Sequence, residues 1–195
     1  MARKTTIEPI DRVMVSSKVG DNPDLLQYNE KAVFSLLKSF GTIVDSNREG
    51  AFSLTNLEEK IVKRADGFVF LPIPKTIKQL KQPERSDFFR EMFKAASLFV
   101  GVQTKDPNLR LNADVEESPL KPMIMVNHEG CWDPFRDMIQ RLHELGTITQ
   151  KPEHILQLVP NVDEAIRLLQ GAHEQKAQVA AHMNAGHKIM RAEDI

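Results

Sequence analysis

Five short apolar runs, each followed by a segment of helical period, constrain this 195-residue chain more than any other feature. The run at 67–72, GFVFLP, contains no polar residue, which is typical of a central parallel strand covered on both faces. Strands that alternate with helices predict an α/β fold, here a Rossmann-like parallel sheet of about five strands with helices on both faces. The five runs cover residues 12–17, 41–46, 67–72, 122–127 and 155–160.

Apolar residues at helical spacing predict the segments between the strands. In 24–39 the expected inner face includes Leu36 and Leu37, and in 133–145 it includes Met138 and Ile139. Ser86 is a suitable N-cap for a helix over 87–100. Further helices are expected over 54–65 and from about residue 161.

The same pattern predicts one domain over residues 1–170. The stretch 102–119 has no period and is rich in polar residues, so it is expected to be a long loop inserted in that domain. Residues 171–195 are rich in alanine and glutamine and are expected to form a helical or flexible tail.

Composition excludes several classes of protein. The formal net charge of −1 argues against a nucleic-acid partner, because phosphate contacts need clustered positive charge. A single cysteine, Cys131, excludes an intrachain disulfide, and the histidine spacing does not suggest a metal site. No apolar run reaches the roughly 18 residues of a membrane span, and the N-terminus has no secretory signal. We therefore expect a soluble, cytoplasmic protein without a membrane partner.

Ligands in parallel α/β sheets bind beyond the carboxyl ends of the strands. Hydroxyl, amide and amino groups follow the predicted strands, a set that suits the phosphate of a nucleotide or phosphosugar. The alternative is that these residues only cap helices and form turns. The predicted ligand-binding residues are Ser16, Ser17, Asn47, Pro74, Lys75, Thr76 and Asn127.

Two segments resemble one known family. They are 63–72, KRADGFVFLP, and 121–135, KPMIMVNHEGCWDPF, the second followed by HELGTI at 143–148 and QLVPNVDEAIRLL at 157–169. These residues are similar to strands and turns of the Lonely Guy (LOG) family of Rossmann-fold phosphoribohydrolases. The resemblance implies a homodimer that acts on nucleoside 5′-monophosphates, with no cofactor.

The chain departs from that family at its signature, Pro-Gly-Gly-x-Gly-Thr-x-x-Glu. The corresponding stretch is 72–79, PIPKTIKQ, in which Pro72 and Thr76 match, the three glycines are absent and Gln79 stands in place of the glutamate. An amide cannot stabilise the oxocarbenium character of N-glycosidic cleavage as a carboxylate does. We therefore expect a nucleotide- or phosphosugar-binding protein whose hydrolase activity is lost or altered.

Two alternatives stay open. The chain could be a non-catalytic regulatory or interaction protein on a dimeric scaffold, or an active N-glycosidic hydrolase with a relocated carboxylate. Glu129 and Asp133 are catalytic candidates beside Gln79, and Glu49 and Asp66 are further sources of a carboxylate. His128 could assist Glu129 in acid–base chemistry. Trp132 could stack on a base, although such an aromatic more often packs at a helix start.

Overall fold

The computed structural model describes residues 12–16, 23–45, 62, 64–74, 84–103, 109–110, 120–149, 151–172 and 174. Most of the expected helix at 54–65, most of the loop 102–119 and most of the tail 171–195 lie outside these residues. The strands are β1 (Arg12–Ser16), β2 (Thr42–Asp45), β3 (Gly67–Phe70), β4 (Met123–Val126) and β5 (Leu156–Val159). The helices are α1 (Pro23–Phe40), α3 (Glu84–Gln103), α4 (Asp133–Glu144) and a helix over 162–172, with 3₁₀ turns η3 (His128–Gly130) and η4 (Pro152–His154).

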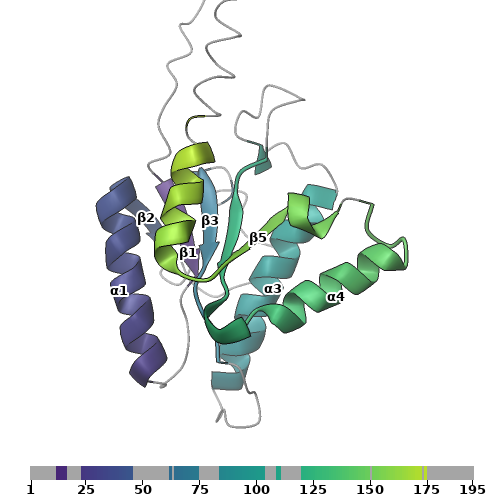
Figure 1. Cartoon of the computed structure of the whole chain (residues 1–195), viewed down its shortest axis with the longest axis horizontal. Coiled ribbons are helices and arrows are strands. Elements are labelled where there is room, and N and C mark those ends of the chain that lie inside the picture. Colours follow the sequence, from purple (N-terminus) through teal and green to yellow (C-terminus); the bar gives the residue numbers. More distant parts are fainter. Residues whose placement is uncertain are drawn as a thin grey trace, which may run out of the picture.

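The strands form one sheet in the order β2-β1-β3-β4-β5, and every neighbouring pair is parallel. Val13 pairs with Ile43 of β2 and with Gly67 of β3. This arrangement confirms the α/β class and the parallel sheet (Figure 1). In this order β1, β2, β3 and β4 lie side by side, so that their carboxyl ends share one edge.

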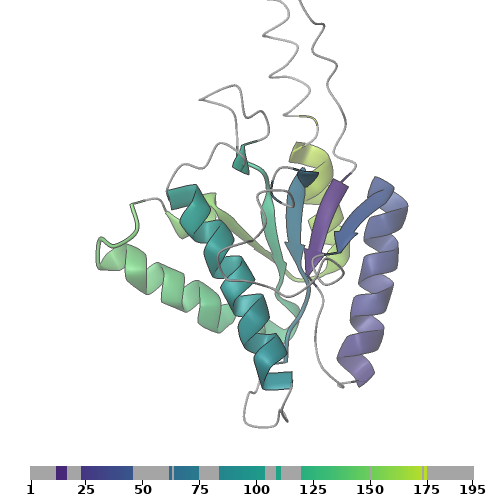
Figure 2. The same cartoon turned by 180° about the vertical axis from the view of Figure 1, so that it is seen from behind.

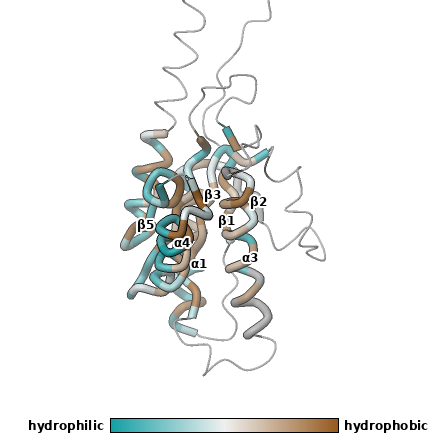
Figure 3. Tube along the Cα trace, turned by 90° about the vertical axis from the view of Figure 1, so that its right-hand side faces the viewer, coloured by the Kyte–Doolittle hydropathy of each residue, from teal (hydrophilic) through white to brown (hydrophobic). Residues whose placement is uncertain are grey.

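Helices cover both faces of the sheet (Figures 1 and 2). On one face α3 and α4 pack over the side chains of Met14, Phe68, Phe70 and Met125. On the other face, α1 and the 162–172 helix cover the residues that alternate with these, which are Val13, Val15, Val69, Leu71, Ile124 and Val126. Because β1, β3 and β4 are enclosed from both sides, their sequences are almost continuously apolar (Figure 3).

Helix α4 begins and ends where its sequence indicates. Pro134 occupies the first turn, where a missing N–H costs nothing, and the acidic Asp133 lies beside it. Arg141 and His143 lie in the last turn, where positive charge suits the helix dipole. Gly146 has a φ of +72° and its N–H bonds the carbonyl of His143, which ends the helix as expected.

Three details of the helix predictions were wrong. Helix α3 begins at Glu84 and runs to Gln103, so it is longer at both ends than the expected 87–100 and Ser86 does not cap it. Leu37 and Met138, expected on inner faces, are each 43% exposed. The inward stripes are narrower than the apolar patterns suggest, with Leu36 and Ile139 buried beside these two exposed residues.

Two described residues of the inserted loop contact the rest of the domain: Leu109 is buried, and its carbonyl accepts from the N–H of Lys121 at 2.7 Å. Arg110 and Leu120 form an isolated antiparallel bridge, which brings the two sides of the predicted loop together before β4. Within the described part of the chain, no helix combines the length and apolar character needed to cross a membrane.

Candidate functional site

The order of the strands defines where a ligand is expected. The chain passes from β1 outward to β2 and then returns to the other side of β1 to form β3. The point between β1 and β3 is therefore the topological switch point, beside which α/β proteins bind their ligands at the carboxyl edge. There the N–H of Leu71 donates to the carbonyl of Ser16 at 2.9 Å, so the two strand ends stay paired up to this edge.

A buried polar cluster lies directly at the end of β1. The Ser16 hydroxyl donates to a carboxylate oxygen of Glu91 on α3, and Lys94 Nζ donates to Ser16 Oγ at 3.0 Å. Lys94 also bonds Glu91 Oε1 at 2.7 Å. All three residues are at most 1% exposed. A ligand at this edge would therefore meet the Ser16 hydroxyl only if α3 moved away from it.

The buried polar role of Glu91 and Lys94 was not predicted from the sequence, although their spacing indicates it. Positions 91, 94, 95 and 98 have the spacing of one helix face, and Ala95 and Leu98 are buried on it. Two opposite charges on an otherwise apolar face indicate a buried ion pair that needs a polar partner across the interface. Ser16, the one polar residue at the end of an apolar strand, is that partner.

A tight turn follows β4. The side chain of Asn127 holds it from two directions: Oδ1 accepts from the N–H of Trp132 at 2.7 Å, and Nδ2 donates to Asp133 Oδ1 at 2.9 Å. Within the turn Glu129 has a φ of +54° and Gly130 a φ of +78°. An added Cβ on Gly130 would lie 2.5 Å from Asp133 Oδ2, so glycine is needed both for its conformation and for this close approach.

The carboxylates proposed from the sequence lie in different surroundings. Asp133 is bonded to Asn127 and also to Arg136, at 3.0 Å. Glu129 is exposed on the turn. Asp66 lies at the amino end of β3, where its N–H bonds the carbonyl of Arg12, so it is on the edge of the sheet opposite to the expected ligand.

Trp132 is a core residue. It is fully buried, its indole N–H donates to the carbonyl of Leu71 at 3.2 Å, and its ring meets the edges of Phe70 and Phe135. This confirms the packing interpretation and leaves no face for a base. Cys131, buried beside it, fits the expected role of a small apolar residue.

Helix α1 closes the edge over β3 and β4. Asn29 Nδ2 donates to the carbonyl of Pro72 at 3.1 Å, which fixes the helix against the end of β3. At the preceding residue, the ring of Tyr28 stacks on that of His128, with centroids 4.7 Å apart and an interplanar angle of 21°. Burial raises the pKa of the Tyr28 phenol; a hydrogen bond with the Val162 backbone opposes this and the charge of Asp163 adds to it.

The described members of the predicted site are Ser16, Pro74, Asn127, Glu129 and Asp133. The structure brings Asn127, Glu129 and Asp133 together in one turn, and it places Ser16 and Pro74 at the ends of β1 and β3. The remaining predicted residues lie outside the described part of the chain, and they are Ser17, Asn47, Lys75, Thr76 and Gln79, together with Glu49.

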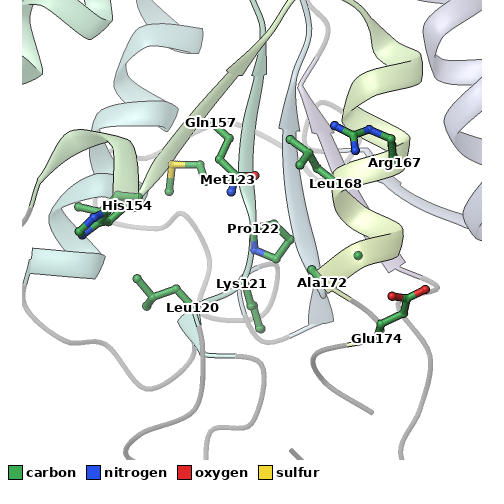
Figure 4. A pocket seen from close by; sticks show the side chains of 12 residues that line it. Leu120, Lys121, Pro122, Met123, His154, Gln157, Arg167, Leu168, Ala172 and Glu174 are labelled. Carbon is green, nitrogen blue, oxygen red and sulfur yellow. The ribbon is translucent and has the colours of Figure 1, made fainter. Parts of the chain in front are cut away.

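A cavity of about 510 Å³ lies at the opposite edge, around the amino ends of β4 and β5 (Figure 4). Its basic side chains already have partners: Lys121 Nζ donates to the carbonyl of Val62 at 2.7 Å, and Arg167 pairs with Glu164. The volume suits a small molecule, but parallel sheets bind ligands at the other edge. We therefore assign the candidate site by topology. No cluster of three or more metal-ligating His, Cys, Asp or Glu side chains occurs among the described residues.

Gly130→Ala should destabilise the protein more than Gly146→Ala, which serves as a matched control. Both glycines have positive φ, which costs roughly 1–2 kcal/mol for an L-residue, but no atom lies within 4 Å of an added Cβ at Gly146. At Gly130 the methyl also pushes on Asp133 Oδ2, and a shift of that carboxylate weakens the hydrogen bond between its Oδ1 and Asn127, which adds up to about 1 kcal/mol. Urea unfolding measures both changes. Equal losses for the two variants would show that the Asp133 contact contributes nothing.

Breaking the buried ion pair from one side should be costly. Lys94→Met or Glu91→Leu each leaves a buried charge without its partner and should lower the free energy of unfolding by about 3–5 kcal/mol. The double variant Glu91→Leu/Lys94→Met removes both charges and should recover most of that loss. Equilibrium denaturation of the four proteins gives the coupling free energy.

The control is the exposed Arg141–Glu144 pair, which has the same i, i+3 spacing on α4. Arg141→Met should change stability little, because water screens that pair. A loss for Lys94→Met as small as for Arg141→Met would contradict the buried pair.

Comparisons with known proteins add no assignment. No protein-family model matches the chain, and no curated protein matches it significantly. The resemblance to the Lonely Guy family therefore stays a prediction.

Proposed function

We propose that this protein binds a nucleotide or a phosphosugar at the carboxyl edge of its sheet and that it has lost efficient N-glycosidic hydrolysis. The observation that carries the proposal is the strand order β2-β1-β3-β4-β5, with its switch point between β1 and β3. Asn127, in one of the segments that resemble the family, follows β4 at this edge. Binding without efficient cleavage agrees with the absence of the family's glycines and glutamate from 72–79.

Chain connectivity supports a phosphate-binding role for the segment after β3. Pro74 is the last described residue of that segment, and consecutive Cα atoms are about 3.8 Å apart. Lys75 and Thr76 directly follow Pro74 in the sequence, five and six residues after the end of β3. A lysine there can replace, with a point charge, the backbone N–H contacts that a glycine-rich loop makes to phosphate.

The loss of hydrolysis is supported by the state of two described carboxylates near this edge, whereas Glu129, exposed on the turn after β4, is the candidate that the relocated-carboxylate hypothesis retains. Glu91 is neutralised by Lys94 and is buried away from solvent. Asp133 is held by Asn127 and Arg136. Neither is a free carboxylate that could stabilise an oxocarbenium ion beside a bound ribose.

A specific observation favours the alternative of an interaction protein. The outer side of α3 exposes Phe89, Phe93 and Val100, each about half exposed. Apolar side chains gathered on one helix suit contact with another protein. The homodimer that the resemblance implies is part of this alternative, and light scattering tests it.

Ribose 5-phosphate should stabilise the native protein without any chemistry taking place. At a concentration one hundred times Kd, a ligand that binds only the native state adds about 2.7 kcal/mol, visible as a rise in melting temperature. Release of base from AMP should stay near background. Turnover near 1 s⁻¹, within the ordinary range of enzymes, would revive the relocated-carboxylate hypothesis. A melting temperature that no phosphorylated ligand changes would favour the interaction protein.

Lys75→Ala should weaken binding of ribose 5-phosphate by about 1.5–3 kcal/mol, the contribution of a hydrogen bond to a charged group. Lys38→Ala, which removes an exposed lysine from the last turn of α1, is the matched control and should leave binding unchanged. Titration calorimetry measures both. Equal effects of the two substitutions would remove Lys75 from the site.

A further inference from the structure

The stacked pair of Tyr28 and His128 has a position that core packing alone does not require. Both rings are half-buried, in contrast to the fully buried Trp132 three residues after Glu129. Their centroids are 4.7 Å apart and their planes are inclined by 21°. One ring comes from α1 and the other from the first residue of η3, so the pair spans the carboxyl edge on the α1 face.

The residue next to each ring is fixed by side-chain hydrogen bonds. Next to Tyr28, the side chain of Asn29 is bonded to the carbonyl of Pro72. Next to His128, the side chain of Asn127 is bonded to Trp132 and Asp133. A stack anchored on both sides loses little conformational freedom when a ligand binds, so little of the binding free energy is offset.

The backbone beside His128 carries a further signal. Glu129 adopts a φ of +54°, an uncommon conformation for a residue with a side chain. Such a conformation persists only where the surroundings fix it, and it is concentrated at ligand-binding positions.

We propose that the Tyr28–His128 pair is a platform on which the base of a bound nucleotide stacks. The inference rests on the proposed function, because it adds the position of the base to a ligand held at the same edge. Every nucleobase has an aromatic face, so stacking selects for a base without selecting strongly among bases. It also separates nucleotides from sugar phosphates, which have no ring to stack.

The test compares AMP with ribose 5-phosphate and adenosine on the full-length chain. Wild-type protein should bind AMP more tightly than ribose 5-phosphate by roughly tenfold to a hundredfold, the range expected for one stacked base. Tyr28→Leu should abolish that difference while leaving ribose 5-phosphate binding unchanged. Tyr28→Phe is the matched control, because it keeps the ring, and it should bind AMP nearly as well as wild type.

A second measurement does not depend on a substitution at Tyr28. Binding of AMP should shift the ring proton resonances of His128 upfield in the NMR spectrum, because a stacked base shields them. Those resonances are assigned by their loss in His128→Gln. Ribose 5-phosphate should produce no such shift.

The possible results separate the two proposals. Equal affinities for AMP and ribose 5-phosphate, with no shift at His128, would overturn the stacking platform and leave phosphosugar binding intact. Binding of AMP and adenosine that depends on Tyr28, without binding of ribose 5-phosphate, would support the platform and overturn the phosphate site. No binding of any of the three would overturn both.

Discussion

A parallel sheet enclosed on both faces is the constraint on which this structure depends. Each strand must supply apolar side chains in both directions, and β1, β3 and β4 do so with alternating residues that enter two separate clusters. Burial of this kind supplies most of the stabilising free energy at about 25 cal/mol per Å² of apolar surface. Because the strands themselves are apolar, polar side chains that could bind a ligand lie at the strand ends. A functional site is therefore expected at the carboxyl edge.

The exception to this apolar interior is the Ser16–Glu91–Lys94 cluster. Removing two charges from water is costly unless each has a partner. Here Glu91 and Lys94 of α3 pair with each other, and both bond Ser16 at the end of β1. The cluster therefore links the position of α3 to the switch point.

On the α1 face of the same edge, the elements are held in place by hydrogen bonds of two asparagine side chains and not by an ion pair. Asn127 organises the turn after β4, and Asn29 attaches α1 to β3. Together they set Tyr28 against His128. The proposed ligand would thus contact a charged segment after β3 and an aromatic pair beside β4. This division suits a molecule with a phosphate at one end and a base at the other.

The sequence by itself determined the α/β class, the strands and most helix boundaries, because strand runs and helical stripes depend on local spacing. Only the tertiary structure decided which polar side chains bond within the protein. Ser16 is bonded to Glu91 and Lys94, and Trp132 is bonded to Leu71. It also decided that Asp66 lies on the opposite edge and that Tyr28 meets His128. These outcomes depend on contacts between residues 54 to 100 positions apart, and local spacing carries no information about such distances.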